Sequence, residues 1–265
     1  MSVYEVALAG LGVVTAYMVV LWAVSLYLRD ASIVDIFWGP GFIAAAGAYF
    51  AFSDDGYEGR QFLVLALVAV WGVRLGAHIL ARNAGHGEDP RYRHWRETWA
   101  GPFWLRSLLQ VFLLQGLLLW IISAPLLAAT HNAEPDSLTA TDFIGLAIWC
   151  FGFFFEAVGD WQLARFKSDP ANEGKVMDRG LWRYTRHPNY FGDATLWWGF
   201  FVIAAGTTDG WATVFSPVIM TFLLLRVSGV AMLERGMKRR RPEYQSYVER
   251  TSAFIPLPPK PERDA

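Results

Sequence analysis

The stretch QFLVLALVAVWGVRLGAHILA, residues 61–81, decides the fold of this chain, because it is 21 residues long and almost wholly apolar. Its only side chains that can carry a charge are Arg74 and His78. An α-helix needs about 20 apolar residues to cross a hydrocarbon core of ~30 Å. We therefore predict that this run forms a membrane-spanning helix.

The composition of the whole chain agrees with a membrane protein. Of its 265 residues, 54% are hydrophobic, 16% are aromatic and only 18% are charged, and the mean hydropathy is +0.27. This is too apolar for an ordinary soluble domain, so the surplus apolar surface must face lipid. The composition therefore excludes a disordered chain and a soluble α/β enzyme, and the single cysteine, Cys150, excludes a disulfide scaffold.

Similar apolar runs occur on both sides of the first one and predict an all-α, polytopic membrane protein with about seven transmembrane helices. The predicted spans are residues 3–28, 36–52, 61–81, 107–129, 143–163, 188–206 and 211–233. The second span is short and has Gly39, Pro40 and Gly41 near its start, so we expect it to be kinked or tilted.

The distribution of Lys and Arg predicts the orientation of these helices. With the C-terminus in the cytoplasm, 20 of the 23 basic residues fall in cytoplasmic segments, and Arg60 alone falls on the outer side. This is the pattern of the positive-inside rule. We predict an outer N-terminus and a single integral membrane domain over residues 1–265. The tail 256–265 is rich in Pro and charge, and we expect a disordered end over 259–265.

Ionisable and amide side chains inside the spans are candidates for a functional site, because a charge within the membrane costs about 2.5–3.5 kcal/mol on insertion scales. They occur in pairs that share a helix face and fall in the expected cytoplasmic half. We expect one inner pocket; snorkelling side chains and structural ion pairs are the alternative. The pairs are Arg74 with His78, Glu156 with Asp160, Asn189 with Asp193, and Arg226 with Glu234.

The loop 165–187 and the helix that begins at Pro188 hold the highest density of basic, polar and aromatic side chains that could bind a ligand. A helix start favours anions, and Arg183, Arg186 and His187 precede this one. The rings of Trp182, Tyr184 and Tyr190 can stack on a planar base, while Asn189 and Asp193 can bind hydroxyl or amide groups. These features fit a phosphate-bearing ligand with an aromatic ring, such as a dinucleotide. The alternative is a basic loop attracted to anionic lipid headgroups.

Other cofactor and partner signatures are absent from the sequence. Gly10-Leu11-Gly12 lies in an apolar helix without a preceding strand, so it is not a dinucleotide fingerprint. His86 and His94 lack the spacing of metal ligands, and we expect no metal site. The basic segments alternate with membrane spans, which explains them by orientation and argues against nucleic acid as a partner.

Five motifs make the chain similar to the steroid 5α-reductase superfamily, in particular to its bacterial DUF1295 branch. They are GLWRYTRHPNYFGD at 180–193, the pattern FxxExxxDWQxxRFK at 153–167, SIVDIFWGPGF at 32–42, WGVRLGAHILARN at 71–83 and PEYQSYVERTSAFIP at 242–256. The resemblance implies a seven-helix membrane fold, a bacterial inner membrane, and a reduced nicotinamide dinucleotide held on the cytoplasmic side by residues of about 140–258.

The resemblance also implies which residues bind the dinucleotide. By motif they are Asp160, Arg165, Lys167, Tyr184, Arg186, His187, Asn189, Tyr190 and Asp193, and shorter motifs add Arg74, Arg82 and Glu234. We add Glu156, because it is ionisable and lies within a predicted span, and Arg183, because it is a cation shortly before the helix start at Pro188. Arg165 and Lys167 provide spare cations for a 2′-phosphate, which favours NADPH over NADH.

The substrate half departs from the superfamily, whose assigned steroid reductases carry a Gln-Glu pair on the second helix and a Tyr on the third. This chain has Asp35, Phe37 and Trp38 at the second helix entrance, and Trp71 near the Tyr position. Asp35 is our candidate acid, because burial raises a carboxyl pKa toward the working range, and Trp38 would shape the cavity. The alternative is that Asp35 caps the helix beginning at Ile36.

The leading hypothesis is hydride transfer from NADPH to a polarised C=C bond of a lipophilic molecule, steroid-, sterol- or isoprenoid-like, that enters from the bilayer. Membrane lipids are the other expected partners. A second hypothesis is a methyltransferase that uses S-adenosylmethionine, because isoprenylcysteine carboxyl methyltransferases carry a similar RHPxY turn. A third is a lipid-binding scaffold without catalysis.

Overall fold

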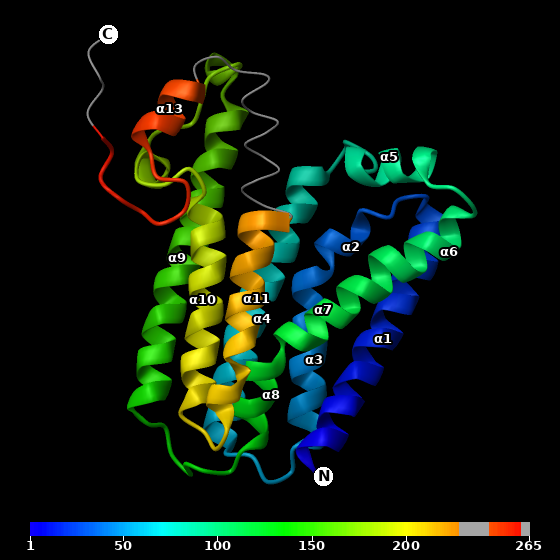
Figure 1. The fold of residues 1–265 in the computed structure, drawn as a ribbon, viewed down its shortest axis with the longest axis vertical. Helices are drawn as coiled ribbons and strands as arrows, with labels where there is room; N and C mark the ends of the chain where they lie inside the picture. The colour runs from blue at the N-terminus through cyan, green and yellow to red at the C-terminus, as the bar shows by residue number, and fades with distance from the viewer. Residues whose placement is uncertain (228–243, 261–265) are drawn as a thin grey trace. The chain divides into compact units, whose positions relative to one another are not determined.

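The computed structural model describes residues 1–227 and 244–260, and the secondary structure of these residues is helical (Figure 1). The chain divides into two compact units. Residues 1–142 and 203–216 form the first unit, and residues 143–202 and 217–265 form the second.

Eight α-helices of the described chain lie in the first unit, and a π-helical turn, Leu108–Leu113, connects two of them. Helix α3 lies beside both α1 and α4 (Figure 1). The helices are α1 Val3–Leu28, α2 Ile33–Ile36, α3 Trp38–Phe52, α4 Glu58–Asn83, α5 Pro90–Thr98, α6 Phe103–Ser107, α7 Leu114–Ile122 and α8 Ala124–His131.

Helix α1 has the bounds predicted from its apolar run, and local capping explains them. The Ser2 hydroxyl accepts a hydrogen bond from the Glu5 amide, and the Ser2 amide donates to the Glu5 carboxylate at 2.7 Å. This reciprocal arrangement satisfies two amides at the helix start. The helix ends where Arg29 adopts a left-handed conformation with φ 55°.

The predicted second span is broken near its start, as expected. The short helix α2 ends at Ile36, and α3 begins at Trp38, so Pro40 lies in the first turn of α3, where its missing amide costs no hydrogen bond. Further along, α3 and α4 are in backbone contact, because a Cβ on Gly39 would lie 2.7 Å from the Gly72 carbonyl oxygen. This contact needs glycine on both helices.

The predicted fourth span, 107–129, differs from the structure in its bounds. The helical stretch begins earlier, at Phe103, and ends at Ile122, after which α8 starts as a separate helix with Pro125 in its first turn. Between them, the Ser123 hydroxyl donates to the Trp120 carbonyl oxygen at 2.8 Å. The sequence stays apolar across this break, so hydropathy alone could not locate it.

Arg60, the exception to the charge rule, is fully buried in the first unit and has a compensating partner. Its Nε donates to the Asp142 carboxylate at 2.9 Å, and its Nη2 donates to the carbonyl oxygens of Pro135 and Ser137. Paired in this way, Arg60 adds no free positive charge to the expected outer side.

In the second unit, helix α9 (Ala140–Ser168) packs against α10 (Pro188–Ala205) through glycines. A Cβ on Gly192 would lie 2.3 Å from the Glu156 amide nitrogen, and one on Gly152 would lie 2.5 Å from the Leu196 amide nitrogen. Such a close approach is typical of membrane helices that associate through small residues. The other helices of this unit are α11 Phe215–Phe222, a π-helical turn Leu223–Val227, and α13 Tyr244–Arg250.

The C-terminal segment of the second unit is bonded to the loop before α10. The Leu257 amide donates to the Tyr184 carbonyl oxygen at 2.9 Å, and the Lys260 amide donates to the Arg250 carbonyl oxygen at 2.9 Å. The Thr185 hydroxyl donates to the Phe254 carbonyl oxygen at 2.8 Å. The described part of the Pro-rich tail, through Lys260, is therefore bonded to the rest of this unit, and the disordered end over 259–265 stays a prediction.

Five helical stretches within the described residues are long and apolar enough to cross a membrane: 3–28, 58–83, 103–122, 140–168 and 210–227. The chain is therefore an all-helical membrane protein. The two other predicted spans form helices α3 and α10, but α3 has 15 residues and reaches only about 22 Å. Residues 228–233 of the last predicted span lie outside the described residues, and the count of seven and the orientation remain predictions.

The substitution Gly192→Ala tests the contact between α9 and α10. The new methyl group would meet the backbone of α9, so we expect a loss of about 1–3 kcal/mol in stability, measured as a lower melting temperature of the detergent-purified protein. Gly12→Ala is the control, because a Cβ there meets nothing within 4 Å and alanine favours a helix. Equal melting temperatures for the two variants would contradict the packing described here.

Candidate functional site

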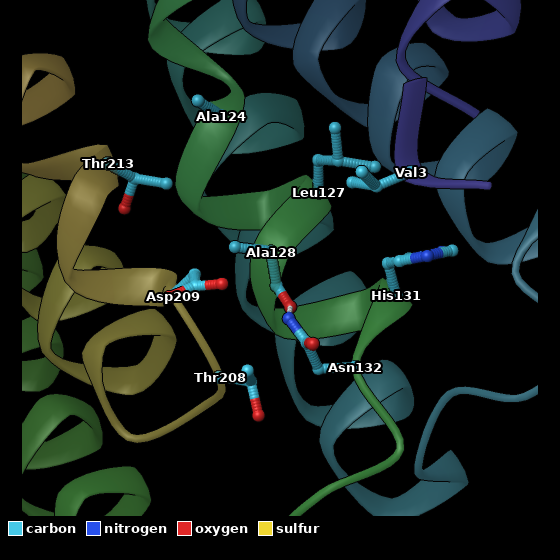
Figure 2. A pocket seen from close by; sticks show the side chains of 9 residues that line it. All are labelled: Val3, Ala124, Leu127, Ala128, His131, Asn132, Thr208, Asp209 and Thr213. Atoms are coloured by element: carbon cyan, nitrogen blue, oxygen red, sulfur yellow. Dashed lines mark hydrogen bonds between the residues drawn. The ribbon is translucent and has the colours of Figure 1, made fainter. Parts of the chain in front are cut away.

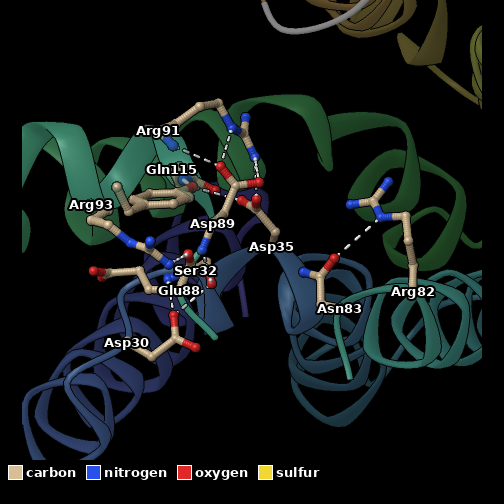
Figure 3. A network of polar contacts seen from close by, with 11 residues as sticks. Asp30, Ser32, Asp35, Arg82, Asn83, Glu88, Asp89, Arg91, Arg93 and Gln115 are labelled. Atoms are coloured by element: carbon tan, nitrogen blue, oxygen red, sulfur yellow. Dashed lines mark hydrogen bonds and ion pairs between the residues drawn. The ribbon is translucent and has the colours of Figure 1, made fainter. Parts of the chain in front are cut away.

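A cluster of polar side chains joins α2 and α5 in the first unit (Figure 3). The sequence forms α5 here because Asp89 caps its start, accepting from the Arg91 amide at 2.9 Å, and Pro90 occupies its first position. This helix presents Arg91 and Tyr92 to the side chain of Asp35 on α2.

Asp35 lies at the centre of this cluster and accepts two short hydrogen bonds. One carboxylate oxygen accepts from Arg91 Nη2 at 2.7 Å, and the other accepts from the Tyr92 hydroxyl at 2.7 Å. The capping alternative for Asp35 is wrong, because Phe37 holds the cap position of α3 and makes no side-chain cap bond. The side chain is used for an ion pair between elements instead.

Burial and neighbouring charges shift the pKa values of Asp35, Tyr92 and Asp89 in this cluster. Burial raises the pKa of Asp35, while the Arg91 charge and the Tyr92 hydrogen bond act in the opposite direction. Burial and then the Asp35 charge raise the pKa of Tyr92, so its hydroxyl keeps its proton at neutral pH. Burial alone would raise the pKa of Asp89, but the hydrogen bonds from Arg91 hold that pKa below its ordinary value.

A second set of contacts fixes the same two elements. The buried Glu88 carboxylate accepts from the Ala31 amide at 2.8 Å and from Arg96 Nη2 at 2.7 Å. The Asp89 amide donates to the Ser32 hydroxyl, which in turn donates to Asp30. These bonds hold the turn before α2 against the start of α5, so the Asp35 carboxylate has a fixed position.

Trp38, the other predicted catalytic residue, belongs to an aromatic cluster of the first unit. Its ring meets Phe42 edge-on with centroids 5.1 Å apart, and Phe42 meets the fully buried Trp71 at 5.5 Å. Arg74 follows Trp71 by one helical turn on α4, and Figure 3 shows Arg82 apart from the Asp35 cluster, bonded to Asn83. Both arginines thus lie on the helix that contributes Trp71.

In the second unit, the start of α10 brings several predicted residues together. Asn189 Nδ2 donates to the Asp160 carboxylate of α9 at 2.9 Å. The rings of His187 and Tyr190 are stacked with centroids 5.6 Å apart. Five of the predicted ionisable side chains are buried here: Glu156, Asp160, Arg186, His187 and Asp193. The structure therefore gives the helix start a polar interior.

Arg186 has a structural role that the sequence did not indicate. It is buried, and its Nη1 donates to the carbonyl oxygens of Val248 and Thr251 in the C-terminal segment. Nearby, the Tyr247 hydroxyl donates to the Trp182 carbonyl oxygen, and Trp182 Nε1 donates to the Gly159 carbonyl oxygen at 3.0 Å. These bonds join the RHPNY turn to the closing motif of the chain.

The remaining predicted residues do not join this buried group. Arg165, Lys167, Arg183 and Tyr184 are exposed. Arg165 is five positions from Asp160 and therefore about 140° around the helix from it. Glu234 lies outside the described residues. The cofactor roles of all these residues remain predictions.

Sequence reasoning missed Tyr92 and Gln115, whose side-chain amide approaches the Tyr92 hydroxyl at 3.4 Å. It treated residues 82–106 as a basic loop that sets orientation. The signal for a helix there was Asp89-Pro90, a cap followed by proline, which predicts a helix start and hence a side-chain array on α5.

The first unit also has a cavity of about 370 Å³ away from all predicted site residues (Figure 2). Its lining comes from α8, the start of α1 and residues 208–213, with Leu127 and Val3 on one side and Asn132 and Asp209 on the other. The Asn132 amide is already bonded to the Ala128 carbonyl oxygen and the Thr207 hydroxyl. We assign this cavity no role.

The helices and the membrane-spanning lengths define an all-helical integral membrane protein, and comparison with known proteins gives its family. The pattern of the family described as "Protein of unknown function (DUF1295)" matches residues 21–251. The chain belongs to this family, which is related to steroid 5α-reductase-like proteins.

A fission yeast protein is similar over most of its length. The uncharacterized protein C594.04c of Schizosaccharomyces pombe is 25% identical over 264 residues, covering 89% of this chain and 76% of the yeast protein. No solved structure matches the chain.

Replacing Arg91 by Met tests the electrostatics of the Asp35 cluster. Without this cation the pKa of Asp35 in the folded protein rises further. The folded protein then binds a proton at Asp35 over a pH range that extends from the ordinary carboxyl pKa of 3.8 up to this raised pKa. Stability is then lost as the pH rises through that range. Near neutral pH we expect Arg91→Met to be about 1 kcal/mol less stable to unfolding than the unmodified protein, because the ion pair is partly exposed. At pH 5 the difference in stability should be smaller.

The measurement is the melting temperature of the detergent-purified protein between pH 5 and 8. Arg93→Met is the matched control, because Arg93 lies on the same helix and donates to the Glu88 carbonyl oxygen rather than to a carboxylate. A deficit in Arg91→Met that does not change with pH would contradict the coupling to Asp35.

Proposed function

We propose that this protein is a membrane reductase that transfers a hydride from NADPH to a polarised C=C bond of a lipophilic, steroid-, sterol- or isoprenoid-like substrate. The observation that carries the proposal is the contact between Asn189 and Asp160 among buried carboxylates at the start of α10. Buried polar groups in a membrane protein are costly, so a ligand that uses them explains their presence.

The donors and acceptors at this helix start fit a nicotinamide dinucleotide. Asp160 and Asn189 offer the carboxylate and amide that bind ribose hydroxyls or a carboxamide. The stacked rings of His187 and Tyr190 offer a face to a planar ring. The exposed Arg183 and Lys167 would meet phosphates, next to a helix N-terminus that favours anions.

The bound dinucleotide would supply the hydride to one carbon of the double bond. The protein must then deliver a proton to the other carbon, and we assign this task to Asp35 together with Tyr92. Burial raises the pKa of the Asp35 carboxyl toward the working range, so Asp35 can carry the proton for a polarised acceptor, and the Tyr92 hydroxyl holds this carboxyl in position at 2.7 Å. Trp38 would shape the apolar wall, while Arg91 keeps the carboxylate in place.

We also propose the orientation in which the C-terminus and the dinucleotide residues face the cytoplasm of a bacterial inner membrane. The charge distribution supports the orientation, and the pairing of Arg60 with Asp142 supports it further by neutralising the one outer cation. The yeast relative means that family membership alone does not assign the protein to bacteria.

A methyltransferase that uses S-adenosylmethionine is the second candidate, and one observation favours it. Arg186 is one of the cations of the RHPNY region that favour a phosphate-rich ligand, yet its Nη1 donates to backbone carbonyl oxygens. Because fewer cations are then available to bind phosphate groups, this observation favours a ligand without phosphate.

The melting temperature of the detergent-purified protein with NADPH, NADH or S-adenosylmethionine separates these candidates, because a ligand of the native state raises it by mass action. We expect a rise with NADPH that Asn189→Ala abolishes. Thr195→Ala is the control, since Thr195 lies on the same helix and its hydroxyl donates to the Phe191 carbonyl oxygen of that helix. A rise with S-adenosylmethionine alone would identify a methyltransferase instead.

Asp35→Asn tests the proton donor. We expect NADPH oxidation with hydrophobic enones to fall about 100-fold or more, while the rise in melting temperature with NADPH is retained. Asp54→Asn is the matched control, because Asp54 is an exposed carboxylate of the same unit that takes no part in the Asp35 cluster. Unchanged oxidation in Asp35→Asn would remove Asp35 from the mechanism.

A further inference from the structure

A groove of about 490 Å³ lies in the second unit, at the end of α9. Its walls combine aromatic and basic side chains, among them Trp161, Phe166, Arg165 and Arg179. No role follows for this groove from the proposed reductase chemistry, because Arg165 lies about 140° around the helix from Asp160, which is bonded to α10.

The groove continues an exposed apolar stripe along α9. Phe143, Cys150, Phe154 and Trp161 are exposed at intervals of four and seven residues, so they lie on one helix face, and Arg165 follows four residues after Trp161. Phe143, Phe154 and Trp161 are 58%, 51% and 57% exposed. In a membrane helix, such a stripe is the surface that meets lipid chains, and a Trp at its end marks the membrane interface.

The groove has a net positive charge, because Arg165 and Arg179 outnumber Asp169, the acidic residue of its lining. The Arg165 guanidinium lies 5.6 Å from the centroid of the Trp161 ring, a cation–π contact that holds it at the interface. Within the described chain, no ion pair neutralises Arg165 or Arg179. The Asp169 carboxylate is turned to its own loop, where it accepts from the Ala171 amide at 2.9 Å, and it forms no ion pair with either arginine within the described chain.

We propose that this groove binds the phosphate headgroup of an anionic phospholipid. Arg165 and Arg179 bind the phosphate oxygens, because guanidinium groups form paired hydrogen bonds with phosphate. One acyl chain follows the exposed stripe of α9 from Trp161 toward Phe154. In this proposal Arg165 binds a structural lipid rather than the dinucleotide. The proposal does not depend on whether the protein is a reductase.

Lipid-dependent stabilisation of the detergent-purified protein tests the proposal. Phosphatidylglycerol, phosphatidylcholine and inorganic phosphate are added separately, and the melting temperature is measured. We expect phosphatidylglycerol to raise it more than phosphatidylcholine does, and inorganic phosphate to leave it unchanged. The gain from phosphatidylglycerol should fall by at least half in Arg179→Ala and in Arg165→Gln, and disappear in the double variant.

Lys175→Ala is the matched control, because it removes an exposed cation of the same loop that does not line the groove. Its gain from phosphatidylglycerol should equal that of the unmodified protein. A full gain in the double variant, or an equal loss in Lys175→Ala, would overturn the proposal. An effect of inorganic phosphate equal to that of the lipid would identify a free anion as the ligand.

The NADPH response of Arg179→Ala separates this site from the dinucleotide. If the unmodified protein is stabilised by NADPH, the variant should keep that response while it loses the response to lipid. Loss of both responses would assign the groove to the cofactor and overturn the proposal. An NADPH response absent from both proteins would count against the proposed function alone.

Discussion

The backbone contact between α9 and α10 is the constraint on which the second unit depends. A side chain larger than hydrogen at Gly152 or Gly192 would meet the backbone of the facing helix, so both positions require glycine. Without water in the bilayer core, helices gain little from hydrophobic burial and associate through such close packing. Because the two helices are this close, Asn189 can reach Asp160, and the polar helix start can be buried.

Much of the fold could be predicted from hydropathy, because a lipid environment forces every backbone group into a helical hydrogen bond. The bounds of α1 and the break before Trp38 follow from local signals, a capping box and a proline. Hydropathy could not locate the break at Ser123, because apolar residues continue on both sides of it; the local signal was Pro125, which lies in the first turn of α8.

The candidate site was predictable to a smaller extent. The spacing of Asp160 and Asn189 within their motifs indicated a polar helix start, and the structure joins these two side chains directly. The pairing of Asp35 with Tyr92 was not predictable, because 57 residues separate them and neither residue belongs to a recognised pair in the sequence. The structural contacts of Arg186 were not predictable, since a cation beside a helix start suggested a ligand, and its bonds to carbonyl oxygens of the C-terminal segment have no signal in the sequence.

The ion pair between Arg60 and Asp142 has a consequence for how the chain is made. The two residues are separated by 82 positions, so the carboxylate that neutralises Arg60 does not exist when the first three membrane segments leave the ribosome. At a synthesis rate of about 5–20 residues per second, the cation waits roughly 4–16 s for its partner. During that time Arg60 must stay in contact with water or headgroups, and the segment it begins can settle to its final depth only after the start of α9 has been synthesised.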